Sequence, residues 1–414
     1  MATINTTSTL AGLFKEVYGD NIFELAKYEA KLCNMVPFEQ KDLIGNKFHV
    51  PVSLQLEHGF AYSAAGTTPA APGSNSVPIV TGQMADAQVD GVQLLGGTSI
   101  DYEAIAKSLG GDKKAFVQAT KMAVKTLTAS AAKRLEMQFL HGRRGIGVVN
   151  ADPGTGTTFV ISEASWSPGI WAGMVGAKIT FTDSDYTTAH AGGGPYTVSA
   201  VNMSTRTITV SASLNNDVEI DDIVWLSGAS TTTEWAGLDA VARNTGTLHN
   251  ISASTYELWG GNVYSTSTGP ISMAKILSAI GDTASYGANK DVVAVVSPKA
   301  FEVLNADQAA LRQYPEASSK AKNGFGGIVY GCQVGNVTVL PHALQKDGMC
   351  HIFCPEETSR VGASDLTFIK RHGTDEVLIL EDASYGAAMM RIYSHQNLFV
   401  SAPRHVTVLD GITY

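Results

Sequence analysis

The chain has 414 residues, of which 44% are hydrophobic and 16% are charged, and its net charge is -9. This length can bury a sizeable core in two or three domains, and the excess of acid excludes binding of nucleic acid through a strongly basic surface. The longest aliphatic run, Val292 to Val296, is too short to span a bilayer, and residues 1–7 lack the basic and apolar regions of a signal peptide. Four cysteines are too few for a disulfide framework, so we expect reduced thiols and a cytosolic site of synthesis.

Residues 1–44 begin with polar side chains and then carry a short amphipathic stretch between Leu10 and Ala26. This pattern indicates an N-terminal arm with one or two helices that docks on another surface.

The segment from Gly45 to Asp101 has no helical period. Lys47 to Glu57 alternates apolar and polar residues, Ser63 to Pro78 is rich in small and turn-forming residues, and Gln88 to Ile100 is again extended in pattern. At roughly 3.3 Å per residue, thirteen residues in each direction predict a two-stranded arm about 43 Å long. Because an isolated hairpin is marginally stable in water, we expect this arm to lie on a neighbouring subunit.

The strongest helical pattern in the chain follows. A short helix is expected from Asp101 to Lys107, and a long one from Lys113 to His141, with Asp112 as N-cap and Gly142 as the C-terminal stop. Its apolar residues recur every three or four positions, which we interpret as a face packed in a core: Phe116, Ala119, Ala123, Leu127, Ala131, Leu135 and Phe139.

Residues 145–244 are expected to form an inserted all-β domain, because short strand patterns alternate there with turn residues. Eleven acidic and three basic residues lie between Asn150 and Gly260, together with all five tryptophans. Two compositional changes at the same borders mark a separate module.

Helical and strand patterns alternate in the remaining chain, which predicts an α+β body. Helices are expected at Met273–Tyr286 and Lys299–Leu304. Strands are expected at Asp291–Val296, Gln333–Leu340, His351–Cys354, Leu366–Ile369, Glu376–Leu380, Ala387–Tyr393, Leu398–Ser401 and His405–Leu409.

No constellation of catalytic residues emerges from the sequence, since it has neither a Walker-type phosphate loop nor a nucleophile elbow. Cys350 and Cys354 would lie roughly 13 Å apart on a strand, too far to share one zinc ion, so we interpret them as core residues. The acidic set Asp217, Glu219, Asp221 and Asp222 alternates with apolar residues and predicts the solvent face of a strand; calcium binding there stays an alternative. We expect no catalytic residue, no cofactor and no bound metal, and therefore not an enzyme.

Four stretches, in this order, resemble recurring phrases of one protein family: Gly97 to Glu103, Val292 to Leu304, Gly331 to Pro341, and Met389 to Val408. Together with the order of arm, long loop and long helix, they are similar to the major capsid proteins of tailed double-stranded-DNA phages, which have the Hong Kong 97-type fold. The resemblance covers most of the chain outside residues 145–244.

This resemblance implies a parsing of the chain into six parts. They are an N-terminal arm (1–44), an extended loop (45–101), a peripheral domain with the spine helix (102–144), the β insertion (145–244), an axial domain (245–357), and returning peripheral strands with a C-terminal axial strand (358–414).

It also implies a protein that assembles into hexamers and pentamers of an icosahedral shell around double-stranded DNA, located in the virion and assembled in the bacterial host cytoplasm. Portal, scaffolding and decoration proteins are the expected partners. Contact with DNA should be weak and non-specific, because Arg143-Arg144 is the only arginine doublet, and no membrane partner is expected. Since the chain begins almost directly with the arm, we expect the scaffolding protein to be separate.

Some members of this family join neighbouring subunits through a lysine near the tip of the extended loop. The only lysine between Gly45 and Asp101 is Lys47, at the base, so no covalent cross-link is predicted. Two alternatives stay open: an encapsulin-like compartment shell, which shares the fold, and a carbohydrate-binding or adhesive protein built around the tryptophan-rich module.

Overall fold

The computed structural model describes residues 30–40, 47–57, 60, 62–68, 82–101, 113–190, 194–214, 217–306, 328–369, 380–382 and 387–414. The helices expected near Leu10 to Ala26 and after Asp101, and the Asp112 cap, lie outside these residues. The chain folds as two compact units. The first comprises Met1–Gln40, Gly91–Gly237 and Arg360–Leu398, and the second comprises Lys41–Asp90, Leu238–Ser359 and Phe399–Tyr414.

The first unit is organised around helix α4 (Lys113–His141), whose limits match the predicted ones. Its buried face includes Ala131, Leu135 and Phe139, as the three-to-four spacing indicated. The helix ends at Gly142, whose N–H donates to the carbonyl of Gln138 at 2.8 Å. The short helix α2 (Lys31–Met35) contacts α4, and Cys33 packs against Leu135 in a small apolar cluster.

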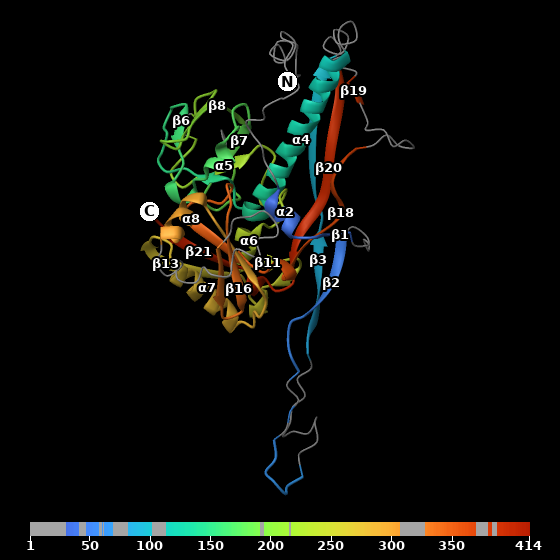
Figure 1. Cartoon of the computed structure of the whole chain (residues 1–414), viewed down its shortest axis with the longest axis vertical. Helices are drawn as coiled ribbons and strands as arrows, with labels where there is room; N and C mark the ends of the chain where they lie inside the picture. Colours follow the sequence, from blue (N-terminus) through green and yellow to red (C-terminus); the bar gives the residue numbers. More distant parts are fainter. Residues whose placement is uncertain are drawn as a thin grey trace. The chain divides into compact units, whose positions relative to one another are not determined.

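Strand β20 (Ala387–Val400) is the long strand of the first unit's open sheet, in which it pairs with β18 (Thr358–Phe368), β19 (Leu380–Asp382) and β4 (Val92–Asp101). The short β1 (Phe38–Gln40) adds to β18 in parallel. Figure 1 shows β4 and β20 running side by side, and their register extends from Ala387 opposite Asp101 to Gln396 opposite Val92. The two strands expected at Ala387–Tyr393 and Leu398–Ser401 are therefore one.

Six short strands form a closed sheet in the first unit, which we call the β module (residues 147–226). They are β5 (Gly147–Val148), β6 (Thr158–Val160), β7 (Lys178–Thr182), β8 (Tyr196–Asn202), β9 (Thr207–Val210) and β10 (Ile223–Leu226), in the order β5-β10-β7-β8-β9-β6. A bridge between Val149 and Ile161 joins the two ends of this order into a small barrel. Phe159 and Phe181 meet edge to face inside it, with ring centroids 5.2 Å apart.

Lys133 connects α4 to the β module. Its Nζ donates to the carbonyls of Ile170 at 3.0 Å and Ala172 at 2.8 Å, at the end of helix α5 (Pro168–Trp171). Burial, reinforced by the neighbouring charge of Arg134, lowers the pKa of Lys133 to about 8. The half-buried lysine therefore acts as a donor to a helix C-terminus, where a positive charge is favourable.

The second unit contains a six-stranded sheet in the order β13-β21-β17-β14-β16-β15. Its strands are β13 (Asn262–Gly269), β14 (Val292–Val296), β15 (Ile328–Cys332), β16 (Gly335–Pro341), β17 (Met349–Phe353) and β21 (Thr407–Ile412). Every residue of β14 is buried, as its uninterrupted valine-rich sequence predicts for a central strand. The sheet and helices α7 (Met273–Ser285) and α8 (Pro298–Ala306) share one apolar core.

Serine caps begin both of these helices. The Oγ of Ser272 accepts from the N–H of Lys275 at 3.3 Å, and the Oγ of Ser297 accepts from the N–H of Ala300 at 3.2 Å. Pro298 occupies the first turn of α8, as expected. The crossover through α8 then lets β16 pair in parallel with β14.

Short elements complete the second unit. They are β2 (Lys47–Ser53), β3 (Met84–Asp90), α6 (Leu238–Ala242), β11 (Thr247–Leu248) and β12 (Ile251–Ser252). Single 3₁₀ turns lie at Glu163–Ser165 in the first unit, and at Glu257–Trp259, Pro355–Glu357 and Pro403–His405 in the second. None of the helices in the described ranges combines the length and apolar character that crossing a bilayer requires.

Candidate assembly surface

The segment that the sequence singled out as an arm forms a two-stranded hairpin in the second unit (Figure 1). β2 and β3 pair antiparallel from Lys47 opposite Asp90 to Ser53 opposite Met84. Among the described residues of this segment, the paired length is seven residues, about 23 Å, compared with the predicted 43 Å.

Two features of the chain shorten the pairing relative to the prediction. Beyond Ser53 the chain leaves the strand, although the N–H of Leu54 still donates to the carbonyl of Gln83 at 2.9 Å. The stretch expected as one extended segment from Gln88 to Ile100 is split at Gly91, where β3 ends and β4 begins. A Cβ at Gly91 would lie 1.9 Å from the ring of His395, so a larger residue here would have to displace that side chain.

The base of the hairpin is anchored on its own unit. Phe48, Ala87 and Val89 are fully buried. The N–H of Gln88 donates to the carbonyl of His249 at 3.0 Å, and the hydroxyl of Tyr256 donates to the Oε1 of Gln83 at 2.7 Å. The base is therefore a fixed part of the fold of the second unit.

Charged side chains also pair across the base. The Nζ of Lys47 lies 3.5 Å from the carboxylate of Asp90, and His49 is paired with Asp86. Lys47 thus lies at the base, as its position in the sequence indicated, and it has an ionic contact there.

Four large apolar side chains near and beyond the distal end of the β2–β3 pairing are exposed. Leu56 is 76% exposed, Phe60 75%, Tyr62 99% and Met84 81%. A single exposed leucine is unremarkable in a folded protein, but four large apolar side chains on one hairpin indicate a surface that another molecule covers. The sequence pattern indicated the segment but not these four residues. The sequence did contain a signal for these four residues, because they are large and apolar in a stretch of mostly small and polar residues.

The tryptophans of the acidic region do not form a binding surface. Trp166, Trp171, Trp225, Trp235 and Trp259 are each at most 4% exposed. Trp166 and Trp171 stack on each other with centroids 6.3 Å apart, and the Nε1 of Trp225 donates to Thr182 at 2.8 Å. Because a sugar-binding tryptophan must offer a ring face to solvent, these residues contribute to the core and give no support to carbohydrate binding.

The acidic set at Asp217 to Asp222 is not the solvent face of a strand, so that prediction is wrong. Residues 217–222 form a loop and turn that lead into β10, with Asp221 in the left-handed region at φ 67°. Asp222 points inward and is buried. The alternation failed as a strand signal because a turn at Ile220 and Asp221 interrupts the extended backbone.

The cysteines of the second unit are core residues, as interpreted from their spacing. Cys350 lies on β17 with no exposed surface, and burial raises the pKa of its thiol to about 12. Cys354 is also buried, just after the strand. Neither has the lowered pKa of a reactive thiolate.

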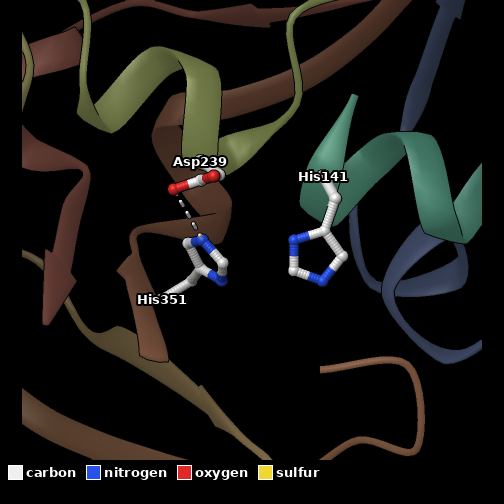
Figure 2. Close-up of side chains that lie close together, drawn as sticks. All are labelled: His141, Asp239 and His351. Carbon is white, nitrogen blue, oxygen red and sulfur yellow. Dashed lines mark ion pairs between the residues drawn. The ribbon is translucent and has the colours of Figure 1, made fainter. Parts of the chain in front are cut away.

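A network of buried charges lies near His351 in the second unit. Figure 2 shows the carboxylate of Asp239 beside the ring of His351, with 3.7 Å between Oδ1 and Nε2. Asp239 also accepts from the Nε of Arg243 at 2.7 Å, and Arg243 reaches Asp410 at 2.6 Å. Burial would lower the pKa of Arg243, but the two carboxylates raise it, so the guanidinium stays charged and ties α6 to β21.

The arginine doublet is also engaged within its own unit. The Nε of Arg143 donates to the carbonyl of Glu234 at 2.9 Å, and its N–H donates to the Oε2 of Glu234 at 3.0 Å. The guanidinium of Arg144 lies 4.4 Å above the ring of Tyr186. This arrangement does not form a basic strip for DNA.

Comparison with known proteins adds the fold family. No protein-family model matches the sequence, and no curated protein matches it. Among solved structures, the chain is similar to one from the capsid asymmetric unit of cyanophage A-1(L), with a TM-score of 0.57 at 10% identity, covering 99% of this chain and 100% of that one. The chain has a phage capsid fold.

Two further capsid chains give lower scores. The capsid of cyanophage P-SCSP1u has a TM-score of 0.48 at 9% identity, covering 97% of this chain and 94% of that one. Mycobacterium phage Bobi has a TM-score of 0.45 at 12% identity, covering 99% and 100%. The match to cyanophage A-1(L) confirms the predicted α+β, Hong Kong 97-type capsid fold.

Proposed function

We propose that this chain is a phage major capsid protein that assembles into hexamers and pentamers of an icosahedral shell enclosing double-stranded DNA. One observation carries the proposal: a hairpin with a fixed base presents exposed apolar side chains, in a chain that has a capsid fold. The exposed residues then become buried on the neighbouring subunit.

The energies fit an assembly held by many modest contacts. Full burial of one large apolar side chain stabilises by roughly 1.5–3 kcal/mol, and the hairpin offers four. Ordering the partner surfaces opposes this gain, so each contact is weak by itself. Closed symmetry repeats the contact around every ring and over the shell, which gives the particle its cohesion.

The parts of the chain take the roles that the resemblance implies. Residues 1–44 serve as the N-terminal arm, 45–101 as the extended loop, 102–144 as the spine-helix region, 145–244 as the inserted β domain, 245–357 as the axial domain, and 358–414 as the returning strands. The six-strand β module lies within the proposed insertion, and the hairpin lies within the proposed extended loop.

The partners follow from the same role. A portal, a separate scaffolding protein and a decoration protein would act with this chain, which would be assembled in the bacterial host cytoplasm and reside in the virion. The DNA is held by weak, non-specific contact, consistent with the engaged arginine doublet. The role is structural and not enzymatic, and Lys47 at the hairpin base supports assembly without a covalent cross-link.

Deletion of Ser63 to Pro78 tests the role of the hairpin. The deleted chain should give a folded subunit, judged by circular dichroism and urea unfolding, that forms no closed shells in negative-stain electron micrographs. The full-length chain, expressed in parallel with the same scaffolding protein as the deleted chain, should form shells. Normal particles from the deleted chain would refute the proposal.

The contents of the particles separate the two kinds of shell. Nuclease-protected double-stranded DNA inside particles from infected cells supports a phage capsid. Particles that instead carry an enzyme cargo and no DNA would favour the encapsulin-like alternative.

A further inference from the structure

Asp183, His190 and Asp222 meet at one end of the β module, and the strand register explains why. Thr182 at the end of β7 is paired with Ile223 at the start of β10, so Asp183 and Asp222 are the next residues on neighbouring strands. Residues 183–188 form a tight loop in which the N–H of Asp183 donates to the carbonyl of Thr188 at 2.9 Å. A bridge between Thr182 and Ala189 then returns the chain beside β7 and places His190 there.

The donor atoms of these residues converge. The Nε2 of His190 lies 2.8 Å from the Oδ1 of Asp183 and 2.9 Å from the Oδ2 of Asp222, and all three atoms lie within 4.8 Å of one another. Asp222 is buried, His190 is largely buried and Asp183 is half-exposed. The Oδ2 of Asp222 also accepts from the N–H of Glu219 at 2.7 Å, which fixes the direction of that carboxylate.

Two carboxylate oxygens share the Nε2 of His190. Both oxygens are within hydrogen-bonding distance of this buried nitrogen, which carries at most one proton and can direct it straight at only one of them. Ligands of a metal have this relation, since they stand side by side around the ion and do not face one another. With bonds of about 2.1 Å, neighbouring ligands of a tetrahedral zinc ion are roughly 3.4 Å apart, so the two oxygens need to move outward by roughly half an ångström to admit an ion.

The charge and the access to the cluster fit a cation. The carboxylates of Asp183 and Asp222 carry two negative charges, which a dication would neutralise. His190 also lines a hollow of about 480 Å³, whose other lining residues include Thr180, Thr182, Tyr186 and Ser230. This hollow gives an ion a route to the cluster and gives water room to fill the remaining coordination positions.

We propose that Asp183, His190 and Asp222 bind a divalent transition-metal ion of the zinc class, which joins the β7 and β10 ends of the β module. An imidazole ligand suits zinc and its neighbours, whereas calcium and magnesium select oxygen ligands alone. The ion links the loop after β7 to the strand β10 and so stabilises the β module in every subunit. This site is independent of the assembly proposed above.

The test measures metal binding to the full-length chain in its unassembled form. The protein is stripped with a chelator, desalted, and titrated with zinc chloride by calorimetry and by thermal unfolding. Asp183→Asn, His190→Gln and Asp222→Asn are compared with Asp221→Asn, a control that makes the same charge change one residue away. Asn suits the left-handed backbone at this exposed control position.

Wild type and Asp221→Asn should each bind one equivalent of zinc. The three site variants should bind no zinc, or bind it at least about tenfold more weakly, because even an outer-shell change causes a loss of that size. Zinc should raise the melting temperature of the first two proteins and not of the variants. Asp183→Asn changes a half-exposed residue and keeps the test valid if a more buried variant fails to fold. Equal zinc binding by wild type and Asp183→Asn would overturn the proposal. It would also be overturned if the wild type bound calcium more tightly than zinc and His190→Gln left that calcium binding unchanged.

Discussion

The Oε1 atom of Glu136 accepts a hydrogen bond from the backbone N–H of Leu32 at 2.6 Å, across 104 positions of sequence. The same oxygen lies 3.4 Å from the N–H of Cys33. Both N–H groups belong to the first turn of α2, whose N-cap residue, Ala30, has no side-chain acceptor. A buried carboxylate on α4 thus serves as the cap for a distant helix and fixes the segment that precedes β1.

Replacing Glu136 with alanine should lower the free energy of unfolding by about 1–3 kcal/mol, because it leaves buried donors of α2 without their acceptor. Glu136→Gln keeps an acceptor oxygen at the same position and should cost clearly less. Urea unfolding of the unassembled subunit measures both. Equal midpoints for the alanine variant and the wild type would show that Glu136 does not act as the cap.

Local patterns in the sequence predicted the elements whose residue types alone indicate a helix or a buried strand. The repeat of apolar residues and the Gly142 stop predicted α4 with its correct ends, and the valine run predicted β14. The sequence predicted two strands where the structure has the single strand β20. The prediction was wrong because Gln396 and Asn397 break the apolar pattern of the sequence, although both side chains are buried in the fold. Gln396 accepts from Arg360 on β18 at 3.0 Å, a partner that no local pattern shows.

Contacts between distant parts of the chain were also not predictable for the hairpin surface and the Asp183, His190 and Asp222 site. The arm segment was predictable from its composition, but its four exposed apolar residues emerged only once the base was seen to be buried. The trio of Asp183, His190 and Asp222 depends on the pairing of β7 with β10, which sequence spacing does not reveal.

His405 and Glu357 predict a pH dependence of stability. The Nδ1 of His405 lies 2.7 Å from the Oε2 of Glu357, and both side chains are mostly buried. The hydrogen bond to Glu357 raises the pKa of His405 above its ordinary value of 6.5, although burial opposes the rise. The folded state therefore binds the proton more tightly than the unfolded state. The resulting stabilisation is fully present below pH 6.5 and is lost as the pH rises through the folded pKa.

Urea unfolding at a series of pH values from about 5.5 to 8.5 measures this contribution. Glu357→Gln should flatten the fall in stability above pH 6.5. Glu356→Gln makes the same charge change at the adjacent, exposed residue and should leave the pH profile unchanged. The assignment fails if both variants retain the wild-type profile.

Gly237 is required by the close approach of two chain segments. Its N–H donates to the carbonyl of Gly142 at 3.2 Å, beside the end of α4. A Cβ at Gly237 would lie 2.4 Å from the carbonyl oxygen of Gln138 and 2.5 Å from the nitrogen of Gly142, and these backbone atoms cannot rotate away. Gly237→Ala should therefore destabilise by roughly 1–3 kcal/mol, the usual cost of overpacking. Gly246→Ala, which enters open space, is the matched control, and equal urea midpoints for the two variants would contradict this account.

Phe60 and Tyr62 should contribute to assembly and very little to the stability of the subunit, because both side chains are exposed on the hairpin. The double variant Phe60→Ser, Tyr62→Ser should change the free energy of unfolding by no more than about 0.5 kcal/mol. It should raise the protein concentration needed for shell formation about tenfold or more, since each lost burial weakens a contact by roughly 1.5–3 kcal/mol. Light scattering and electron microscopy over a dilution series measure the threshold. Leu258→Ser, also at an exposed apolar residue of the second unit, should leave it unchanged; an equal rise in both would mean that general surface hydrophobicity, and not the hairpin, drives assembly.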